Sequence, residues 1–297
     1  MKTHSHLTIL AICSFLLLGC MADMRTRIIK KEGINSSNET KGKRLLKTTW
    51  DKHGFSKLEN HDTYSFTADD TWKGLMGKMG KPWPEAKSKL KFKYAINTFD
   101  SQVEFLNGKM QNTTAGLQSW QYYEKKEYKD IEFVEDNKRI IFGLSAYQYF
   151  FEMLDRLKNA PIISYAGEKE FNDISYDLIF VTWKDPKPHM EHDQYLLWIN
   201  KNTQLLEYAV YSLRDNYLKI PGYKAFYGSI KFDDYKNIDG VLIPHKQTVF
   251  LNEPSKKDKR HLHQLIVKDF VFDDFDINEL YPNSNLEKIG DNKLNRF

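Results

Sequence analysis

Two groups of histidines have residue types and spacings that could support metal chemistry. The segment 189–193 reads His-Met-Glu-His-Asp, and the segment 261–263 reads His-Leu-His. Zinc accepts imidazole and carboxylate ligands, and a catalytic site needs three of them plus a water. However, Pro186 and Pro188 predict a loop for the first group, and the H-E-x-x-H order that places a glutamate base beside paired helical ligands is absent. We expect solvated polar segments and no metal or cofactor. A metal-dependent hydrolase remains a third hypothesis, with His189, His192, His261 or His263 as its ligands.

Other signatures of catalysis are missing from the sequence. It has no G-x-S-x-G, no Walker loop and no G-x-G-x-x-G after a predicted strand, and its carboxylates, as at Asp273, Asp274 and Asp276, show no informative pairing. Lys and Arg total 44 against 40 acidic residues, and the two signs alternate along the chain without a basic stripe. We therefore predict a protein that is not an enzyme and that does not bind nucleic acid.

One cysteine does indicate a specific chemistry. Lys2 supplies a positive charge before an apolar stretch at 7–18 that is too short to span a bilayer. The stretch ends in Leu17-Leu18-Gly19-Cys20, which resembles a bacterial lipobox. The resemblance implies that the signal is removed before Cys20 and that this residue is acylated. The alternative is an ordinary signal peptide ending at Cys20, although no good A-x-A cleavage site follows.

The lipobox also predicts where in the cell the protein is located. Several acyl chains on one residue hold a protein stably on a membrane. Cys13 would leave with the signal, so the mature chain would keep only the modified Cys20 and could form no disulfide. Met21, in the place where an Asp favours inner-membrane retention of related lipoproteins, favours the outer membrane. We predict a lipid-anchored protein of the bacterial envelope that faces the periplasm.

The rest of the chain divides into three parts. Residues 21–42 are polar and slightly basic without an apolar period, which predicts a flexible tether. Residues 43–281 predict one domain, since no linker or repeat interrupts them, and residues 282–297 predict a loose tail. With 41% hydrophobic and 14% aromatic residues, the domain can bury a large core that favours strands.

Strand patterns dominate the domain. In the segment 89–96, apolar side chains alternate with lysines, which is typical of a half-buried strand. Short links between such segments predict an antiparallel meander. The predicted strands are 64–68, 89–96, 101–106, 117–123, 162–166, 176–183, 195–199, 205–213, a hairpin at 223–251, and 262–272. Pro244 predicts that the second strand of the hairpin is bulged or near an edge.

Helical patterns are few. Residues 43–53 predict a short helix followed by Gly54, and residues 74–84 predict a Gly- and Pro-rich loop. The segment 137–157 repeats apolar residues at helical spacing and is apolar on nearly all sides. Such a helix must be buried on more than one side.

The hairpin carries a family resemblance. Residues 234–245 read DYKNIDGVLIPH, with Asp239-Gly240 at the turn, and resemble the D-Y-x-x-V-D-G-x-x-x-P-H/K signature of the LolA/LolB-like lipoprotein-carrier superfamily. Residues 195–204 are similar to the Y-x-x-x-D/N-x-x-T hairpin of that superfamily. The segment 144–154 resembles an aromatic segment of an uncharacterised lipoprotein family within it. The resemblance covers roughly residues 43–272. It implies an α+β fold, mainly antiparallel β, in which helices plug or cover the concave face of a curved, unclosed half-barrel.

A hollow that the helix and sheet leave unfilled could hold an acyl chain or another apolar ligand. The candidate lining residues are Phe226, Ile230, Phe232, Trp183, Trp198, Tyr149 and Phe150, and each of them could equally be an ordinary core residue. The leading hypothesis is therefore a non-catalytic, membrane-anchored protein that binds lipid. The second hypothesis is a scaffold lipoprotein with a filled interior that recruits a protein partner. The volume of the interior distinguishes the two hypotheses.

Overall fold

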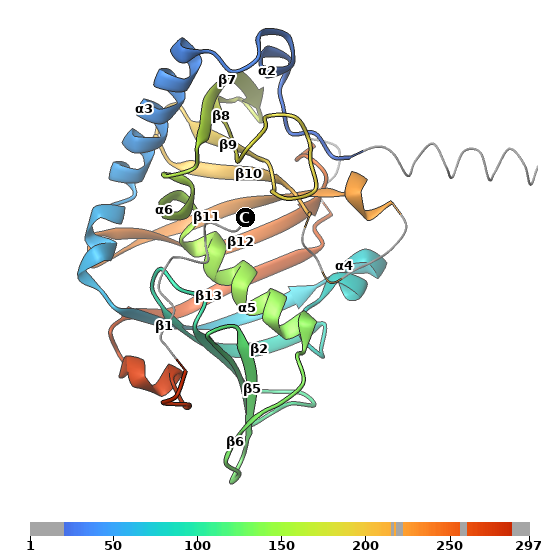
Figure 1. Ribbon diagram of the computed structural model, residues 1–297, viewed down its shortest axis with the longest axis vertical. Helices are drawn as coiled ribbons and strands as arrows, with labels where there is room; N and C mark the ends of the chain where they lie inside the picture. Colours follow the sequence, from blue (N-terminus) through green and yellow to red (C-terminus); the bar gives the residue numbers. More distant parts are fainter. Residues whose placement is uncertain (1–20, 215–216, 218–221, 256–259, 287–297) are drawn as a thin grey trace, which may run out of the picture.

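A computed structural model describes residues 21–214, 217, 222–255 and 260–286 (Figure 1). The predicted signal with Cys20 lies outside the described residues, as does most of the predicted tail. None of the described helices combines the length and apolar character needed to cross a membrane.

The described strands form one antiparallel sheet of 13 strands in the order β6-β5-β4-β3-β2-β1-β13-β12-β11-β10-β9-β8-β7. We call β6 to β1 the first half and β13 to β7 the second half; the β1–β13 pair joins them. The terminal strands β6 and β7 do not pair with each other, so the sheet is unclosed, as the resemblance predicted. The strands are β1 Thr63–Trp72, β2 Lys87–Ala95, β3 Ser101–Phe105, β4 Thr113–Gln118, β5 Gln121–Lys126, β6 Ile131–Phe133, β7 Ile162–Phe171, β8 Ile174–Thr182, β9 Tyr195–Asn200, β10 Leu206–Ser212, β11 Tyr227–Ile238, β12 Val241–Leu251 and β13 His263–Phe272.

The order of the strands requires a helical crossing. β6 and β7 are consecutive in the chain but lie at opposite ends of the sheet, so the segment between them must cross one face. That segment contains α5 (Lys138–Phe151) and α6 (Met153–Leu157), and α5 lies across the sheet in Figure 1. Residues 137–157 are therefore helical, as their apolar period predicted. The remaining helices are α2 Arg27–Glu32, α3 Ser36–Lys52, α4 Gly74–Gly80, and the 3₁₀ turns η1 Phe55–Asn60, η2 Tyr223–Ala225 and η3 Ile277–Leu280.

The sheet curves around α5. Phe151 of α5 packs on Phe66 of β1, with ring centroids 4.8 Å apart, while Phe150 packs on Tyr211 of β10 at 5.3 Å. Two adjacent residues of α5 thus contact strands that lie four steps apart in the sheet, which a flat sheet would not allow. We call the buried side chains of this concave face, together with those of α5 and α6, the inner cluster.

A second core lies on the opposite face of the second half. We call it the outer cluster; it consists of Ala22, Met24, Ile29, Ala166, Phe171, Tyr176, Leu178, Phe180, Leu196, Trp198, Tyr208 and Val210. The first three residues belong to the segment 21–34, which covers the strands. The prediction of a flexible tether over residues 21–42 is therefore wrong: α2 and the first turns of α3 occupy it, and Ala22, Met24 and Ile29 are buried. Three apolar residues among many polar ones show no period, so the sequence did not reveal this cover.

Helix α3 runs along the end strand β7. A Cβ added to Gly42 would lie 2.5 Å from the backbone nitrogen of Tyr165, so only glycine permits this close approach. The helix blocks the side of a strand that would otherwise be exposed, which reduces the risk of pairing with other chains. It begins seven residues before the helix predicted at 43–53, because Asn35 caps it by accepting a hydrogen bond from the amide of Asn38 at 2.9 Å.

The hairpin that carries the family signature connects the end of α3 to the sheet. Asp239 and Gly240 both have positive φ, 50° and 89°, as a two-residue hairpin turn requires. The turn packs on Gly54, where a Cβ would lie 2.0 Å from the Gly240 carbonyl oxygen. His53 accepts a hydrogen bond at Nε2 from the amide of Leu206, 3.1 Å away. The motif therefore fixes the end of α3 to the second half of the sheet.

Several local predictions differ from the structure. The strand predicted at 117–123 is divided by a turn at Ser119 and Trp120, which both have positive φ, between β4 and β5. The segment 74–80 forms the helix α4, not a loop, and its Gly77 packs closely on Leu262, just before β13. β12, predicted to be bulged or near an edge, lies between β11 and β13, and its pairing with β11 shows no shift of register. Pro244 is accommodated because β12 pairs with β13 only from Lys246 to Val249.

Candidate functional site

A cavity of about 550 Å³ lies between α5 and the inner face of the sheet. Ile141, Phe142, Ala146, Tyr149 and Phe150 of α5 form one wall. The other lining residues are Trp72, Pro82, Phe99, Trp120, Asp136, Lys138, Ser145, Tyr147, Asp193, Tyr195, Tyr211, Ser212, Leu213, Tyr217, Val249 and His263. Aromatic and aliphatic side chains dominate this set. The scaffold hypothesis requires a filled interior. The cavity shows that the interior is not completely filled.

A buried polar group lies at one end of the cavity. His263 Nε2 lies 2.8 Å from Asp70 Oδ2 and 3.0 Å from the Tyr147 hydroxyl oxygen, and that hydroxyl donates to the same carboxylate oxygen. The ring of Trp72 stacks on His263 with centroids 4.3 Å apart. Burial, followed by the charge of Asp70, raises the pKa of Tyr147 far above its usual value, so the phenol stays protonated. Because these groups bond to one another, the cluster fixes the orientation of the three side chains on the cavity wall.

The opposite wall contains tyrosines and an acid, Asp193. The rings of Tyr149 and Tyr195 stack at 5.8 Å. Asp193 Oδ1 accepts hydrogen bonds from the Ser212 hydroxyl and the Arg214 amide, both at 2.8 Å. Burial is the main cause that raises the pKa of Tyr149 and of Tyr195, so both remain neutral. Along this wall a ligand would therefore meet mainly ring faces.

Tyr217 lies at the margin of the cavity. Its hydroxyl donates to the carbonyl of Gly80 at the end of α4, and its ring meets Phe142 of α5 edge-on at 5.1 Å. The guanidinium carbon of Arg139 lies 5.0 Å from the ring centroid, within cation–π range. This residue links α4 to α5 beside the opening.

The structure distributes the predicted cavity residues over several places. Tyr149 and Phe150 line the cavity. Ile230 and Phe232 are buried in the inner cluster, and Trp183 packs against it, but none of the three lines the cavity. Trp198 belongs to the outer cluster on the opposite face, and the half-buried Phe226 belongs to neither cluster.

Sequence reasoning missed several lining residues. Trp72, Trp120, Tyr195 and Tyr211 lie at or near the ends of strands and line the cavity. Their aromatic type was visible, but terminal positions carry no alternation that would assign them to a face. The β1–β13 pair, which brings Trp72 beside His263, joins residues too distant in the chain for the sequence to indicate.

The histidines do not assemble a ligand set. The described residues include no group of three or more His, Cys, Asp or Glu side chains that could hold a metal ion. His189 Nδ1 accepts hydrogen bonds from the amides of Glu191 and His192 at 3.3 Å, so this ring orders its own loop. His263 belongs to the Asp70 cluster described above, and burial lowers the pKa of His261. The geometry that the hydrolase hypothesis requires is thus not formed by these residues.

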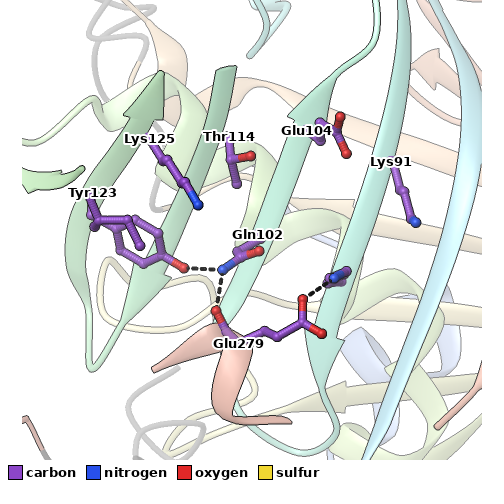
Figure 2. Close-up of a pocket in the computed structure, with 9 residues that line it drawn as sticks. Lys91, Gln102, Glu104, Thr114, Tyr123, Lys125 and Glu279 are labelled. Atoms are coloured by element: carbon purple, nitrogen blue, oxygen red, sulfur yellow. Dashed lines mark hydrogen bonds and ion pairs between the residues drawn. The ribbon is translucent and has the colours of Figure 1, made fainter. Parts of the chain in front are cut away.

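A polar hollow of about 330 Å³ lies on the outer face of the first half (Figure 2). The lining residues are Lys91, Lys93, Gln102, Glu104, Thr114, Tyr123, Lys125, Ile131 and Glu279. Gln102 Nε2 donates to the Tyr123 hydroxyl at 2.8 Å and to the Glu279 carbonyl at 2.6 Å. Lys93 pairs with the Glu279 carboxylate at 2.5 Å. These bonds attach η3 to the sheet, and we assign the hollow a structural role.

The chain resembles several solved structures at low sequence identity. No family model matches the chain, and no curated protein matches it. A DUF1329 family protein from Desulfovibrio piger matches with a TM-score of 0.50 and 12% identity, covering 84% of this chain and 99% of that one. A LolA superfamily protein from Nitrosomonas europaea gives 0.49 and 10%, covering 82% and 99%. A domain described as an outer membrane lipoprotein-sorting protein, from Vibrio parahaemolyticus, gives 0.48 and 11%, covering 84% and 98%.

At these identities the similarity concerns the fold alone. The predicted similarity to the LolA/LolB-like superfamily is confirmed in that sense, at low sequence identity. The chain is an α+β protein with a mainly antiparallel, unclosed sheet whose inner face is covered by helices.

Proposed function

We propose that this protein is a lipid-anchored protein of the bacterial envelope that binds an acyl chain or another apolar ligand beneath α5. The observation that supports the proposal is the cavity of about 550 Å³ on the inner face, lined mainly by aromatic and aliphatic side chains. Its size falls within the range of about 300–1,000 Å³ typical of small-molecule sites. Acylation of Cys20 in the outer membrane remains part of the proposal and rests on the lipobox.

The hydrophobic effect would provide the affinity. Each methylene transferred from water to the cavity stabilises the complex by about 0.8 kcal/mol, so ten methylenes would contribute about 8 kcal/mol before ordering costs. Asp193 Oδ1 and Asp70 Oδ2 already accept hydrogen bonds within the protein. They would therefore not have to lose water when an apolar chain enters. We propose binding without any bond being made or broken.

A pair of variants tests the proposal. Ala146 lies on α5 at the cavity wall, so Ala146→Phe places a ring in the space that the ligand would occupy. We expect the affinity for a fluorescent fatty acid, measured by titration of the delipidated protein, to fall at least about tenfold, equivalent to about 1.4 kcal/mol. Val271→Phe is the matched control, because Val271 is exposed on β13 and does not line the cavity.

Two results would contradict the proposal. One is equal affinity of the two variants, which would place the probe elsewhere. The other is the absence both of co-purified lipid in native mass spectrometry after gentle extraction and of any probe binding. A filled interior in solution would then favour the scaffold hypothesis.

A further inference from the structure

The first described residues are fixed to the domain immediately after the predicted acylation site. The Ala22 amide donates to the carbonyl of Lys224 at 2.8 Å, and the Ala22 carbonyl accepts from Arg214 Nη2 at 2.5 Å. The Met24 amide donates to Gln194 Oε1 at 3.0 Å. Two trans peptide units separate the Cα atoms of Cys20 and Ala22 by at most about 7.6 Å. An acyl chain on Cys20 would therefore start beside the folded domain and not at the end of a long tether.

The residues that hold Ala22 lie at one end of the sheet, where the ends of several neighbouring strands lie side by side. The pairings Trp72 with His263, Val249 with His263, Gly228 with Leu251, Ser212 with Tyr227 and Tyr211 with Tyr195 bring these ends together. Arg214 follows β10 directly, and Lys224 precedes β11. We call this end of the sheet, formed by the ends of these strands, the anchor edge. In Figure 1 the described chain begins on the side of the sheet where α4 also lies.

The anchor edge exposes apolar side chains next to cations. In α4, Leu75 is 76% exposed and Met79 is 39% exposed, and their i,i+4 spacing places them on one face. Gly77 packs this helix onto β13, since a Cβ there would lie 2.6 Å from the Leu262 carbonyl oxygen. Lys73 and Lys78 flank the exposed face, and α4 contains no acidic residue. An apolar face bordered by lysines is the pattern that binds the interface of anionic lipids.

Other groups at this edge are compatible with the same surface. Met190 and Leu251 are each 40% exposed. The acidic Glu191 and Glu253 are paired with Lys184 and Lys169, so their charges are compensated. The cavity also reaches this edge, because Trp72, Val249 and His263 line it.

We propose that the domain docks directly on the bilayer through the anchor edge, with Leu75 and Met79 in the lipid interface and the cavity mouth facing the membrane. This inference rests on the proposed anchoring and ligand binding. In that orientation an acyl chain passes between bilayer and cavity without crossing bulk water. The partner is a lipid surface, and the short connection to Cys20 fixes which face meets it.

The test uses the full mature chain in vesicles of phosphatidylethanolamine and phosphatidylglycerol. Intact mass spectrometry first establishes the acylation of Cys20. Since acylation blocks the native thiol, a single introduced cysteine can carry an environment-sensitive fluorophore. Leu75→Cys reports on α4, and Val271→Cys, exposed at the far end of β13, is the matched control. We expect brominated lipids to quench the label at position 75 and to leave the label at position 271 unchanged.

A second variant isolates the short connection. A flexible Gly/Ser insertion of about twelve residues after Met21 would let the domain leave the surface. We expect loss of most of the quenching at position 75 and unchanged fatty-acid affinity. Equal or absent quenching at positions 75 and 271 in the acylated protein would overturn the docking proposal, as would quenching at 75 that the insertion does not reduce. Failure of the fatty-acid titration would instead overturn the proposed ligand binding, so the two failures are distinguishable.

Discussion

The two halves of the sheet use their outer faces differently. On the first half, Lys91 of β2 and Lys125 of β5 line the polar hollow on the outer face (Figure 2). On the second half, the corresponding face carries Tyr176, Trp198 and Tyr208, and the segment 21–34 covers it. A strand with apolar side chains on both faces must be covered on both. The comparison explains why the N-terminal segment is part of the domain and why the proposed anchor leaves at a defined place.

The largest effect is expected from a variant that disrupts the covered outer face of the second half. Trp198 is fully buried, so Trp198→Ala removes its packing against Phe171 and Tyr208 and leaves a cavity. We expect the free energy of unfolding to fall by about 3–5 kcal/mol. Lys91→Ala on the solvated face is the control and should change it by less than about 0.5 kcal/mol. Urea unfolding of both variants measures the difference, and equal losses would show that the two faces are not distinct.

Acid should destabilise the second half of the sheet by protonating His53. Burial lowers the pKa of His53 to about 4, despite the opposing backbone hydrogen bond with Leu242. The unfolded chain, with an ordinary pKa of about 6.5, binds more protons between these two values. Stability should therefore fall as the pH drops from about 6.5 to 4, by about 3 kcal/mol, with no further loss from this group below pH 4.

Hydrogen exchange at several pH values would locate that loss. His53 contacts Leu206 and Tyr235, so protection should decrease in β10 and β11 before it decreases in β2 and β3. His53→Gln should flatten the dependence in this window. An unchanged pH slope in the variant would assign the acid sensitivity to another group.

The smallest expected effect concerns the cover itself. Ile29 is buried in the outer cluster. We expect Ile29→Ala to lower the free energy of unfolding by about 2 kcal/mol. This is near the low end for such a truncation, because the short α2 can detach locally. Limited trypsin digestion should then cut after Arg25 or Arg27 faster than in the unmodified protein. Lys31→Ala, an exposed change in the same helix, is the control. Equal cleavage rates would show that Ile29 does not hold the segment.

Much of the fold was visible in the sequence because its signals are local. Alternation in β2 gave the strand and its inner face, and the apolar period of 137–157 gave the crossing helix. β9 shows the limit: all six residues of Tyr195–Asn200 are buried, so no alternation says which side is concave. Trp198 was therefore assigned to the wrong face.

The candidate site was less visible than the fold. Tyr149 and Phe150 could be predicted because the helix carrying them had to cover a hollow. Asp70 and Tyr147 meet His263 only through the β1–β13 ladder and the crossing of α5, and neither contact leaves a signal along the chain. Three buried residues in a polar segment were likewise too few to reveal the outer cover.

The β1–β13 ladder pairs Tyr64 with Phe272 and Trp72 with His263, residues from opposite ends of the domain. Closing such long loops is entropically expensive, and the two halves can join only after nearly the whole chain has been synthesised. A chain that stops before His263 would leave β1 and β12 with unpaired backbone and would expose the aromatic interior to other chains. Completion of the last strand is thus the step that removes this risk of aggregation.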